Sequence, residues 1–491
     1  MLKKLQFFSI IIFIFVLISC ASKTESETIK KVPIEIRPVE VYYDWDKYQK
    51  IDEISFEEMQ EDLETFIYII ETAYAGYEDA LVRGMDTNIL RKKILNDFEG
   101  QDIINIEDFA KKLFETFEPY IQDYHANIRS KNNYYGFITP TITYFADVYF
   151  IKQNEDYFVY ESKIPEIKTG EKYESDSQYL FYYPSKGNDV YRLGCLSKDK
   201  PEAQKVSIGK KTYEVPLISC DALYPDFSYV IRETEKSIYF KLTQFYFEND
   251  EQLEALKRFS EAADLCRTKD FVILDVRGNP GGENFYEQKF MTDLYKKDSE
   301  INDILPIPST SIYSPASIEA LTAMINMVLE ADNPRTKKWL KKISKMKKIA
   351  EKESVKILST TKNEKYSVEE SSFKGKIIVL TDCKVASSGE DLLCDCEYLF
   401  GKTNQIVQIG QNTAGCELYG NVCQYTLENS GIKVNFSVTD FSEYPKLISN
   451  FYGEGNGFYP DIWSTNEDLN DSIFYVTHDE EMFGILKDSL Q

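Results

Sequence analysis

Histidine is nearly absent from this sequence: its 491 residues include only two, His125 and His478. Nine cysteines are present, yet no two of them form a CxxC pair. Zinc sites usually need cysteine or histidine ligands at short, regular spacing, so the sequence disfavours a metal site. It also offers very few side chains that could act as a general base near neutral pH.

Positive charge is scarce as well, because 57 lysines and arginines stand against 81 aspartates and glutamates, for a net charge of −24. Such a chain repels phosphate backbones, which disfavours nucleic acid as a partner. A hydrophobic share of 43%, with 35 tyrosines and 31 phenylalanines, is typical of a folded protein. The length predicts about two to four domains.

The N-terminus carries a predicted export signal. Lys3 and Lys4 precede an apolar run, Phe7 to Ile18, that is too short to span a membrane but suits a secretory signal. The following Leu17-Ile18-Ser19-Cys20 resembles the lipobox of bacterial lipoproteins. That resemblance implies a signal peptide over 1–19, lipid attachment to Cys20 and a position outside a membrane of the bacterial cell envelope. The alternative is an ordinary signal peptide with an incidental cysteine.

After a predicted tether over 20–50, two regions of different character follow. Residues 51–130 predict an N-terminal helical domain, opened by a capping box at Ser55 and Glu58, and place His125 in or near a loop. Residues 131–225 alternate between apolar and polar positions, which predicts a β-rich domain with a hairpin around 153–156. Within it, Ile167 to Glu171 faintly resembles a turn of PDZ-type peptide-binding modules.

Residues 226–299 and 371–465 predict an α/β core. A strand over 237–245, a helix over 250–266 and a buried strand over 271–275 form a predicted βαβ unit with parallel strands. The expected fold class is therefore α/β, with several domains. Residues 466–491 are expected to be a C-terminal tail.

Residues 300–370 are expected to be a helical insertion in this core. Trp339, Ile343, Met346 and Ala350 mark one face of its second helix, and lysines cover the rest. Such a helix could contact anionic lipid headgroups, or it could be a solvated helix whose apolar stripe packs on its neighbour. The second interpretation is favoured.

Two short segments are candidates for chemistry. Ser387 and Ser388 lie between a predicted strand, 377–380, and a predicted helix, 389–400, where a helix N-terminus could stabilise developing negative charge. The alternative is a simple serine cap of the helix. The loop Arg277 to Gly282 could bring backbone N–H groups close to a ligand, or it could be only a tight turn. It matches neither GxGxxG nor a P-loop, so nucleotide binding is disfavoured.

Four motifs occur in an order that resembles the C-terminal processing peptidase family, particularly its tricorn-protease-like branch. They are Asp123-Tyr-His125, Asp275 to Gly282, Ser387 to Glu390, and Glu454 to Asp461. The resemblance covers roughly residues 55 to 465. It implies a serine peptidase core of the ClpP/crotonase type that acts on peptide or protein substrates and needs no cofactor.

The same resemblance implies a role for individual residues. Ser387 matches the nucleophile, His125 the general base, and Glu454 a carboxylate that orients the catalytic network. Ser388 and the Gly281-Gly282 turn match the oxyanion hole.

The loop Gly410 to Cys416 lacks the lysine that the Ser/Lys branch of the family carries there. A catalytically inactive relative that binds peptides or apolar ligands is therefore the alternative hypothesis. The oligomeric state stays open.

Overall fold

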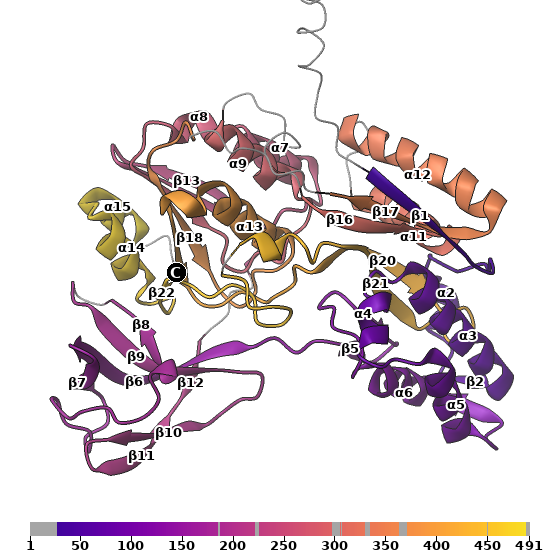
Figure 1. Cartoon of the computed structure of the whole chain (residues 1–491), viewed down its shortest axis with the longest axis horizontal. Helices are drawn as coiled ribbons and strands as arrows, with labels where there is room; N and C mark the ends of the chain where they lie inside the picture. The colour runs from indigo at the N-terminus through magenta and orange to yellow at the C-terminus, as the bar shows by residue number, and fades with distance from the viewer. Residues whose placement is uncertain are drawn as a thin grey trace, which may run out of the picture.

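The computed structural model describes residues 27–184, 187–220, 225–296, 305, 307–328, 334–362, 371–448 and 450–487. The predicted signal peptide and Cys20 lie outside these residues. The chain is an α/β protein with three parts, which we call the core domain, the N-terminal lobe and the β-rich domain (Figure 1). Within the described ranges, no helix is both long enough and apolar enough to cross a bilayer.

The core domain is built on a six-stranded sheet whose strands are parallel from β14 onward. β13 pairs with β14 antiparallel at one edge. The strand order is β13 (Tyr229–Glu233), β14 (Ser237–Leu242), β15 (Phe271–Asp275), β18 (Lys376–Thr381), β19 (Ile406–Gly410) and β22 (Ile462–Trp463). The predicted βαβ unit is confirmed. β15 and β18 are apolar throughout their interiors because helices cover both faces of the sheet.

Alternate strand residues pack toward the two helical layers. Val272 and Val379 face a core shared with α7 (Asp250–Ser260), α9 (Phe285–Tyr295) and α13 (Ser388–Phe400), with the short α8 (Ala263–Cys266) beside them. Ile273 and Ile378 face α14 (Leu469–Thr477) and α15 (Glu480–Leu486). Residues 469–486 are therefore not a tail: their apolar side chains cover the second face of the sheet.

The N-terminal lobe packs helices against a second sheet. Its helices are α2 (Trp45–Tyr48), α3 (Phe56–Ala73), α4 (Tyr77–Val82), α5 (Thr87–Phe98), α6 (Ile106–Phe117), α11 (Pro315–Val328) and α12 (Pro334–Glu353). The predicted capping box is present, because Ser55 Oγ accepts from Glu58 N–H and Glu58 Oε2 accepts from Ser55 N–H. A short pair, β2 (Glu53–Ser55) with β3 (Ile103–Asn105), joins the starts of α3 and α6.

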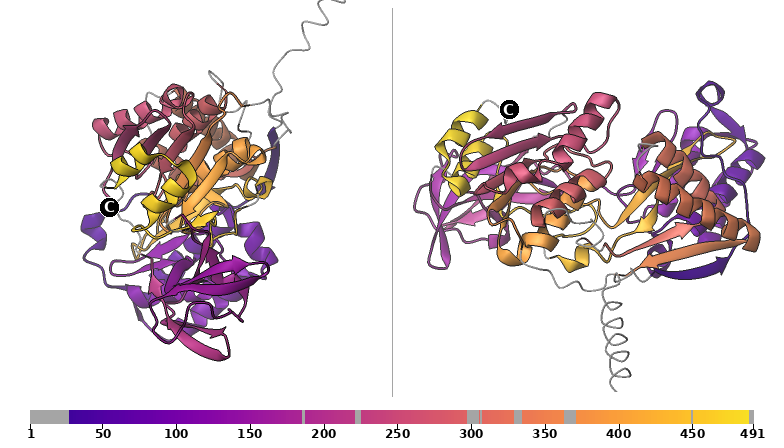
Figure 2. Two further views of the ribbon diagram at one scale, coloured as in Figure 1. Left: turned by 90° about the vertical axis from the view of Figure 1, so that its left-hand side faces the viewer. Right: turned by 90° about the horizontal axis from the view of Figure 1, so that it is seen from above.

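The seven-stranded sheet of this lobe gathers segments from the whole chain. Its order is β1 (Glu27–Pro33), β17 (Val355–Thr361), β16 (Ser309–Tyr313), β21 (Lys433–Asp440), β4 (Asn127–Arg129) and β5 (Tyr134–Gly136), with β20 (Tyr419–Thr426) also on β21. Three expectations are corrected here. Part of the predicted tether is a strand, the predicted helical insertion supplies two strands, and residues 419–440 belong to this lobe rather than to the core domain. Figure 2 shows the lobe on one side of the molecule.

The β-rich domain has the predicted hairpin, β6 (Ile142–Gln153) with β7 (Asp156–Ser162). The sheet is completed by β12 (Ile218–Ser219), β9 (Val190–Ser197) and β8 (Leu180–Tyr182), and a separate hairpin joins β10 (Ala203–Ile208) to β11 (Lys211–Pro216). The domain touches the core domain near α14, where Tyr182 and Tyr475 hydroxyls lie 2.9 Å apart.

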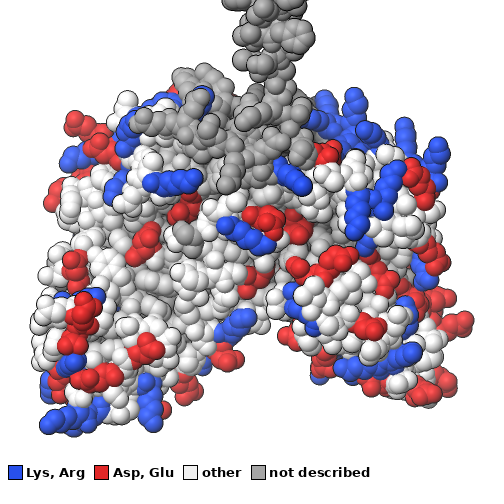
Figure 3. Space-filling model, viewed as in Figure 1, with Lys and Arg blue, Asp and Glu red and all other residues white. Residues whose placement is uncertain are grey.

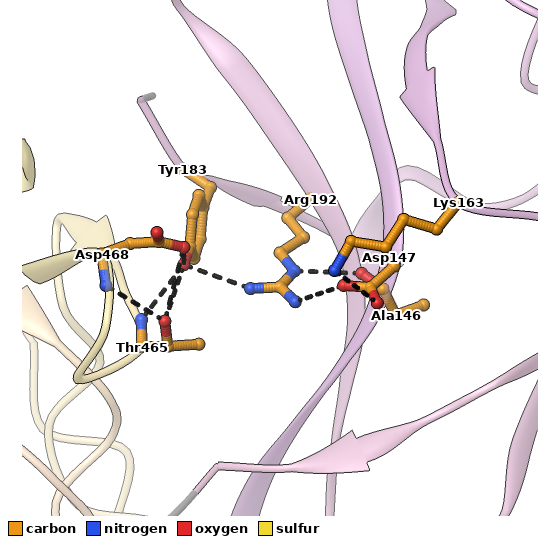
Figure 4. Close-up of polar contacts among 7 residues, drawn as sticks. All are labelled: Ala146, Asp147, Lys163, Tyr183, Arg192, Thr465 and Asp468. Carbon is orange, nitrogen blue, oxygen red and sulfur yellow. Dashed lines mark hydrogen bonds and ion pairs between the residues drawn. The ribbon is translucent and has the colours of Figure 1, made fainter. Parts of the chain in front are cut away.

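A buried polar network fixes this junction (Figure 4). Arg192 donates to Asp147 Oδ1 at 3.0 Å and to the Tyr183 hydroxyl at 3.1 Å. Tyr183 in turn donates to Asp468 Oδ2 at 2.5 Å and receives the N–H of Thr465. Arg192, Asp147 and Tyr183 belong to the β-rich domain, whereas Thr465 and Asp468 follow β22. The Tyr183 hydroxyl therefore links the two domains, and Arg192 holds that tyrosine in place.

Candidate active site

The turn at Ser387 has a strained backbone. β18 ends at Thr381 and α13 begins at Ser388, which leaves Ser387 at the N-cap position with φ 51° and ψ −128°. A residue with a side chain rarely adopts this conformation. The Ser387 side chain makes no cap hydrogen bond, so the serine-cap interpretation is wrong for this residue. The residue is half-buried, and its hydroxyl has no hydrogen-bond partner among the described residues.

The glycine loop lies directly against this turn. Gly281 has φ 100°, and a Cβ there would come within 2.8 Å of Ala386 O and Ser388 N. Gly281 N–H donates to Asn279 Oδ1 at 2.8 Å, and Ser388 Oγ donates to Gly282 O at 2.8 Å. The loop is therefore more than a tight turn, because it is docked on the segment that carries Ser387.

These contacts show which of the predicted oxyanion donors are already used in other hydrogen bonds. The Gly281 N–H is already used by Asn279, which leaves Gly282 as the available donor of the pair. Ser388 is the first residue of α13, where a helix leaves its N–H groups without intrahelical partners. The N–H groups of Gly282 and Ser388 donate to no other described residue, so they are the candidates to bind a ligand at Ser387.

Buried charges hold the glycine loop in place. Arg277 donates to both carboxylate oxygens of Asp275, from Nε at 2.8 Å and Nη2 at 2.7 Å, and the Tyr239 hydroxyl adds a third bond at 2.8 Å. Burial would raise the pKa of Asp275, but the Arg277 guanidinium outweighs it and the pKa is lowered. Gly278 N–H donates to Asp382 Oδ1 at 3.0 Å, which ties the loop to the segment after β18.

His125 lies in the loop between α6 and β4, with its ring against Cys416. Its Nε2 is 3.2 Å from Cys416 Sγ. On the other side, Nδ1 is 3.7 Å from Asp123 Oδ1, beyond hydrogen-bond distance. His125 Nδ1 and Asp123 Oδ2 are both buried without a hydrogen-bond partner among the described residues. An imidazole with one nitrogen on a thiol and a carboxylate close to the other is placed for proton transfer.

The structure brings the histidine and serine segments into one cluster. Ala386, next to Ser387, packs with Ala414 and Cys416, and Tyr124, next to His125, packs against them. No hydrogen bond joins His125 to Ser387 in the described part of the chain. The two predicted residues are therefore gathered from segments over 250 positions apart, with Cys416 rather than Ser387 as the present partner of the imidazole.

Glu454 orients backbone rather than the imidazole. Its carboxylate accepts N–H groups from Leu418 at 2.6 Å, Glu417 at 3.1 Å and Tyr124 at 3.2 Å. The last bond fixes the residue that precedes His125. Burial raises the pKa of Glu454 well above its usual range, and the nearby Asp123 adds to the rise.

Glu390 has a role that the sequence did not reveal. Instead of bonding back to the start of α13, it accepts the hydroxyl of Thr413 and the N–H groups of Gly415 at 2.9 Å and Cys416 at 2.6 Å. Burial raises its pKa to about 7. It therefore fixes the Gly410 to Cys416 loop, and with it the thiol that faces His125. Nothing in the sequence links Glu390 to a loop more than twenty residues later, so this role could not be predicted.

A cavity of roughly 670 Å³ lies beyond the Glu454 loop, where the core and β-rich domains meet. Phe181 and Trp463 stack with ring centroids 4.5 Å apart in its wall, and the ring centroid of Tyr459 lies 5.9 Å from that of Trp463.

Within the described ranges, no group of three histidine, cysteine or acidic side chains is arranged to hold a metal ion.

Sequence comparison finds no matching family model and no matching curated protein. Among solved structures, the chain is similar to mature CPAF, with a TM-score of 0.41 and 11% identity over 88% of this chain and 96% of that one. It is similar to the photosystem II D1 C-terminal processing protease, with a TM-score of 0.32 and 11% identity over 83% and 92%. The tricorn protease gives 0.34 and 14% over 89% of this chain and 37% of its own. Similarity this distant assigns neither family nor function, so both are proposed below from the site itself.

Proposed function

We propose that the chain is a serine peptidase of the C-terminal processing type, with Ser387 as nucleophile and His125 as general base. The observation that carries this is the turn at Ser387. The residue is half-buried, its hydroxyl makes no hydrogen bond to a described residue, and its backbone is strained at a turn against which the glycine loop packs. A purely structural serine would use its hydroxyl in a cap or a core hydrogen bond, and strain of this kind is concentrated at functional sites.

The proposed reaction is acyl transfer from a peptide bond. Ser387 Oγ attacks the carbonyl carbon while His125 takes its proton, and the N–H groups of Gly282 and Ser388 bind the developing oxyanion. His125 then gives the proton to the leaving amine, and water hydrolyses the acyl-enzyme by the same route. No cofactor is needed for any of these steps.

The imidazole has to change partner before it can act. Its Nε2 now faces Cys416 Sγ, so substrate binding must exchange this contact for one with the Ser387 hydroxyl. Asp123, 3.7 Å from Nδ1, is placed to stabilise the imidazolium that forms. Glu454 is a positioning residue that acts through the Tyr124 backbone.

Labelling with a fluorophosphonate probe tests the proposal. The wild type should be labelled, Ser387→Ala should not, and His125→Ala should be labelled at least about a hundredfold more slowly. His478→Ala, which removes the other imidazole, should react like the wild type. A folded wild type that resists labelling contradicts the peptidase proposal and leaves a peptide-binding protein as the second candidate.

We further infer that the protein is exported and lipid-anchored through Cys20. The Leu17 to Cys20 segment after a short apolar run supports this. Cells grown with an alkyne-labelled fatty acid should yield a labelled wild-type protein and an unlabelled Cys20→Ser variant. Equal incorporation into both proteins would disprove the anchor.

A further inference from the structure

α12 concentrates positive charge in a chain that is otherwise acidic. Its 20 residues include nine lysines or arginines and two glutamates, whereas the whole chain has a net charge of −24. Figure 3 shows basic side chains gathered at the upper right, where Figure 1 places α12. This helix is therefore the part of the surface that an anionic partner would find attractive.

The helix has two distinct faces. Ile343, Met346 and Ala350 are buried in the core of the N-terminal lobe. On the opposite face lie four exposed lysines, spaced three, four and three positions apart, which we call the lysine stripe: Lys338, Lys341, Lys345 and Lys348. The apolar face is already covered by protein and cannot insert into a bilayer, so only the lysine stripe remains for a partner.

Two lysines at the borders of these faces form ion pairs with glutamates, whereas the lysines of the stripe do not. Lys342 Nζ lies 2.7 Å from Glu27 Oε1, and Lys347 Nζ lies 3.3 Å from Glu319 Oε2. The four members of the lysine stripe form no ion pair or hydrogen bond with any residue that the structure describes. Their charges are therefore free to act on something outside the chain.

We propose that the lysine stripe docks on an anionic lipid surface. A row of flexible ammonium groups that spans about 15 Å of helix suits a diffuse layer of headgroups. The Glu27–Lys342 ion pair also places the start of the described chain on this helix. Cys20 is seven residues before Glu27, so a lipid anchor there would be at most about 25 Å of chain away. Anchor and lysine stripe would then meet the same membrane.

Docking through this stripe fixes the orientation of the molecule. The remainder of the chain is strongly acidic and is repelled by anionic lipid, so the other faces turn away from it. The β-rich domain lies at the opposite end of the molecule from α12 (Figure 1) and would point outward. This inference is independent of peptidase activity.

Vesicle binding tests the proposal with the full-length chain carrying Cys20→Ser, so that no acyl chain contributes. Phosphatidylcholine vesicles with phosphatidylglycerol should bind the protein at low salt and release it at high salt, because screening weakens charge attraction. Binding to vesicles of phosphatidylcholine alone measures any contribution of the N-terminal apolar run. Replacing all four stripe lysines with glutamine should lower the anionic-vesicle affinity at least about tenfold.

A matched variant controls for total charge. Lys92, Lys93, Lys210 and Lys211 are also exposed, on α5 and at the β10–β11 hairpin, and their replacement by glutamine removes the same charge. It should leave affinity within about threefold of the parent. Exposed, unpaired lysines contribute little to stability, so both variants should keep the parent's thermal midpoint. If the fourfold stripe variant is unstable, the double variant Lys338→Gln/Lys345→Gln replaces it and should show an intermediate loss.

Two results would overturn the proposal. One is an equal loss of affinity in the stripe and control variants, which would make the effect one of net charge. The other is binding of double-stranded DNA without any preference for anionic vesicles at the same salt, which would assign the stripe to a different partner.

Discussion

At the scale of single residues, the glycine loop can pack against Ser387 only because residue 281 is a glycine. Its φ of 100°, and the 2.8 Å that would separate a Cβ at this position from Ala386 O, leave no room for a side chain. Gly281→Ala should therefore push the glycine loop away from Ser387 and lower the fluorophosphonate labelling rate at least about a hundredfold, as loss of one oxyanion donor does. Gly484→Ala is the control, because its Cβ meets nothing within 4 Å in α15. Wild-type labelling of Gly281→Ala would contradict the oxyanion assignment.

Cys416 is an alternative nucleophile to Ser387, because its thiol lies beside an imidazole. Burial raises the pKa of the Cys416 thiol well above its usual range, and the carboxylates of Glu454 and Glu390 raise it further. The thiolate is the reactive form, so the raised pKa disfavours Cys416 as the nucleophile. Its contact with His125 Nε2 holds the imidazole in its resting position.

Cys416→Ala should accordingly be labelled at the wild-type rate or up to about tenfold faster, because His125 Nε2 is released. The labelling rate against probe concentration measures this. Cys423→Ala, at a buried cysteine of β20 that packs in the core of the N-terminal lobe, should leave the rate unchanged. Complete loss of labelling in Cys416→Ala, with Ser387 intact, would make the thiol part of the catalytic machinery.

At the scale of elements, local patterns predicted local structure well. The capping box at Ser55, the β6–β7 hairpin, the β14–β15 parallel pair and the helix after Ser387 are all confirmed. Each depends on residues that are close in sequence or on one apolar period, and so the pattern carries the information.

Long-range pairing could not be predicted in the same way. β1 pairs with β17, so Glu27 lies opposite Thr361, and nothing in either segment specifies the other. The same holds for Glu390, whose three donors come from a loop over twenty residues later. Its position in the first turn of α13 fits an ordinary helix start equally well. Contacts of this kind depend on the whole fold.

The buried Arg192 network should contribute to the free energy of unfolding. Arg192→Met leaves Asp147 and Tyr183 without their buried partner, and should cost about 3 kcal/mol of unfolding free energy. Lys163→Met is the matched control, because Lys163 binds the same Asp147 at 3.1 Å with its own side chain 71% exposed. It should cost less than about 1 kcal/mol. Urea titration measures both, and equal losses would mean that the network is no stronger than a surface pair.

At the scale of the whole molecule, buried carboxyl groups gather around α13. They come from α9, from α13 itself and from the loops of the site, and none forms a salt bridge with a described lysine or arginine: Glu287, Glu390, Asp395, Glu417 and Glu454. Burial raises the pKa of each. Glu287 is the extreme case, because it is 0% exposed and both carboxylate oxygens lack a hydrogen-bond partner among the described residues.

A carboxyl group with a raised pKa is protonated in the folded state and ionised in the unfolded state at pH values between its ordinary pKa, which is 4.5 for glutamate, and its folded pKa. The free energy of unfolding must then fall as pH rises, by about 1.4 kcal/mol per pH unit for each such group, until its folded pKa is reached. For Glu390 this window runs from 4.5 to about 7. For Glu287, burial and the charges of Asp391 and Asp395 raise the pKa well above the ordinary value.

Glu287→Gln isolates this effect, because glutamine resembles the protonated acid and does not titrate. Its stability relative to the wild type should be near zero at pH 4.5 and should grow by about 1.4 kcal/mol per pH unit above it. Urea unfolding at several pH values measures the difference. Glu254→Gln, at an exposed position of α7, should show a difference that does not change with pH. A flat difference for Glu287→Gln as well would mean that Glu287 is ionised in the fold, and that the carboxyl groups around α13 are stabilised by contacts stronger than those described.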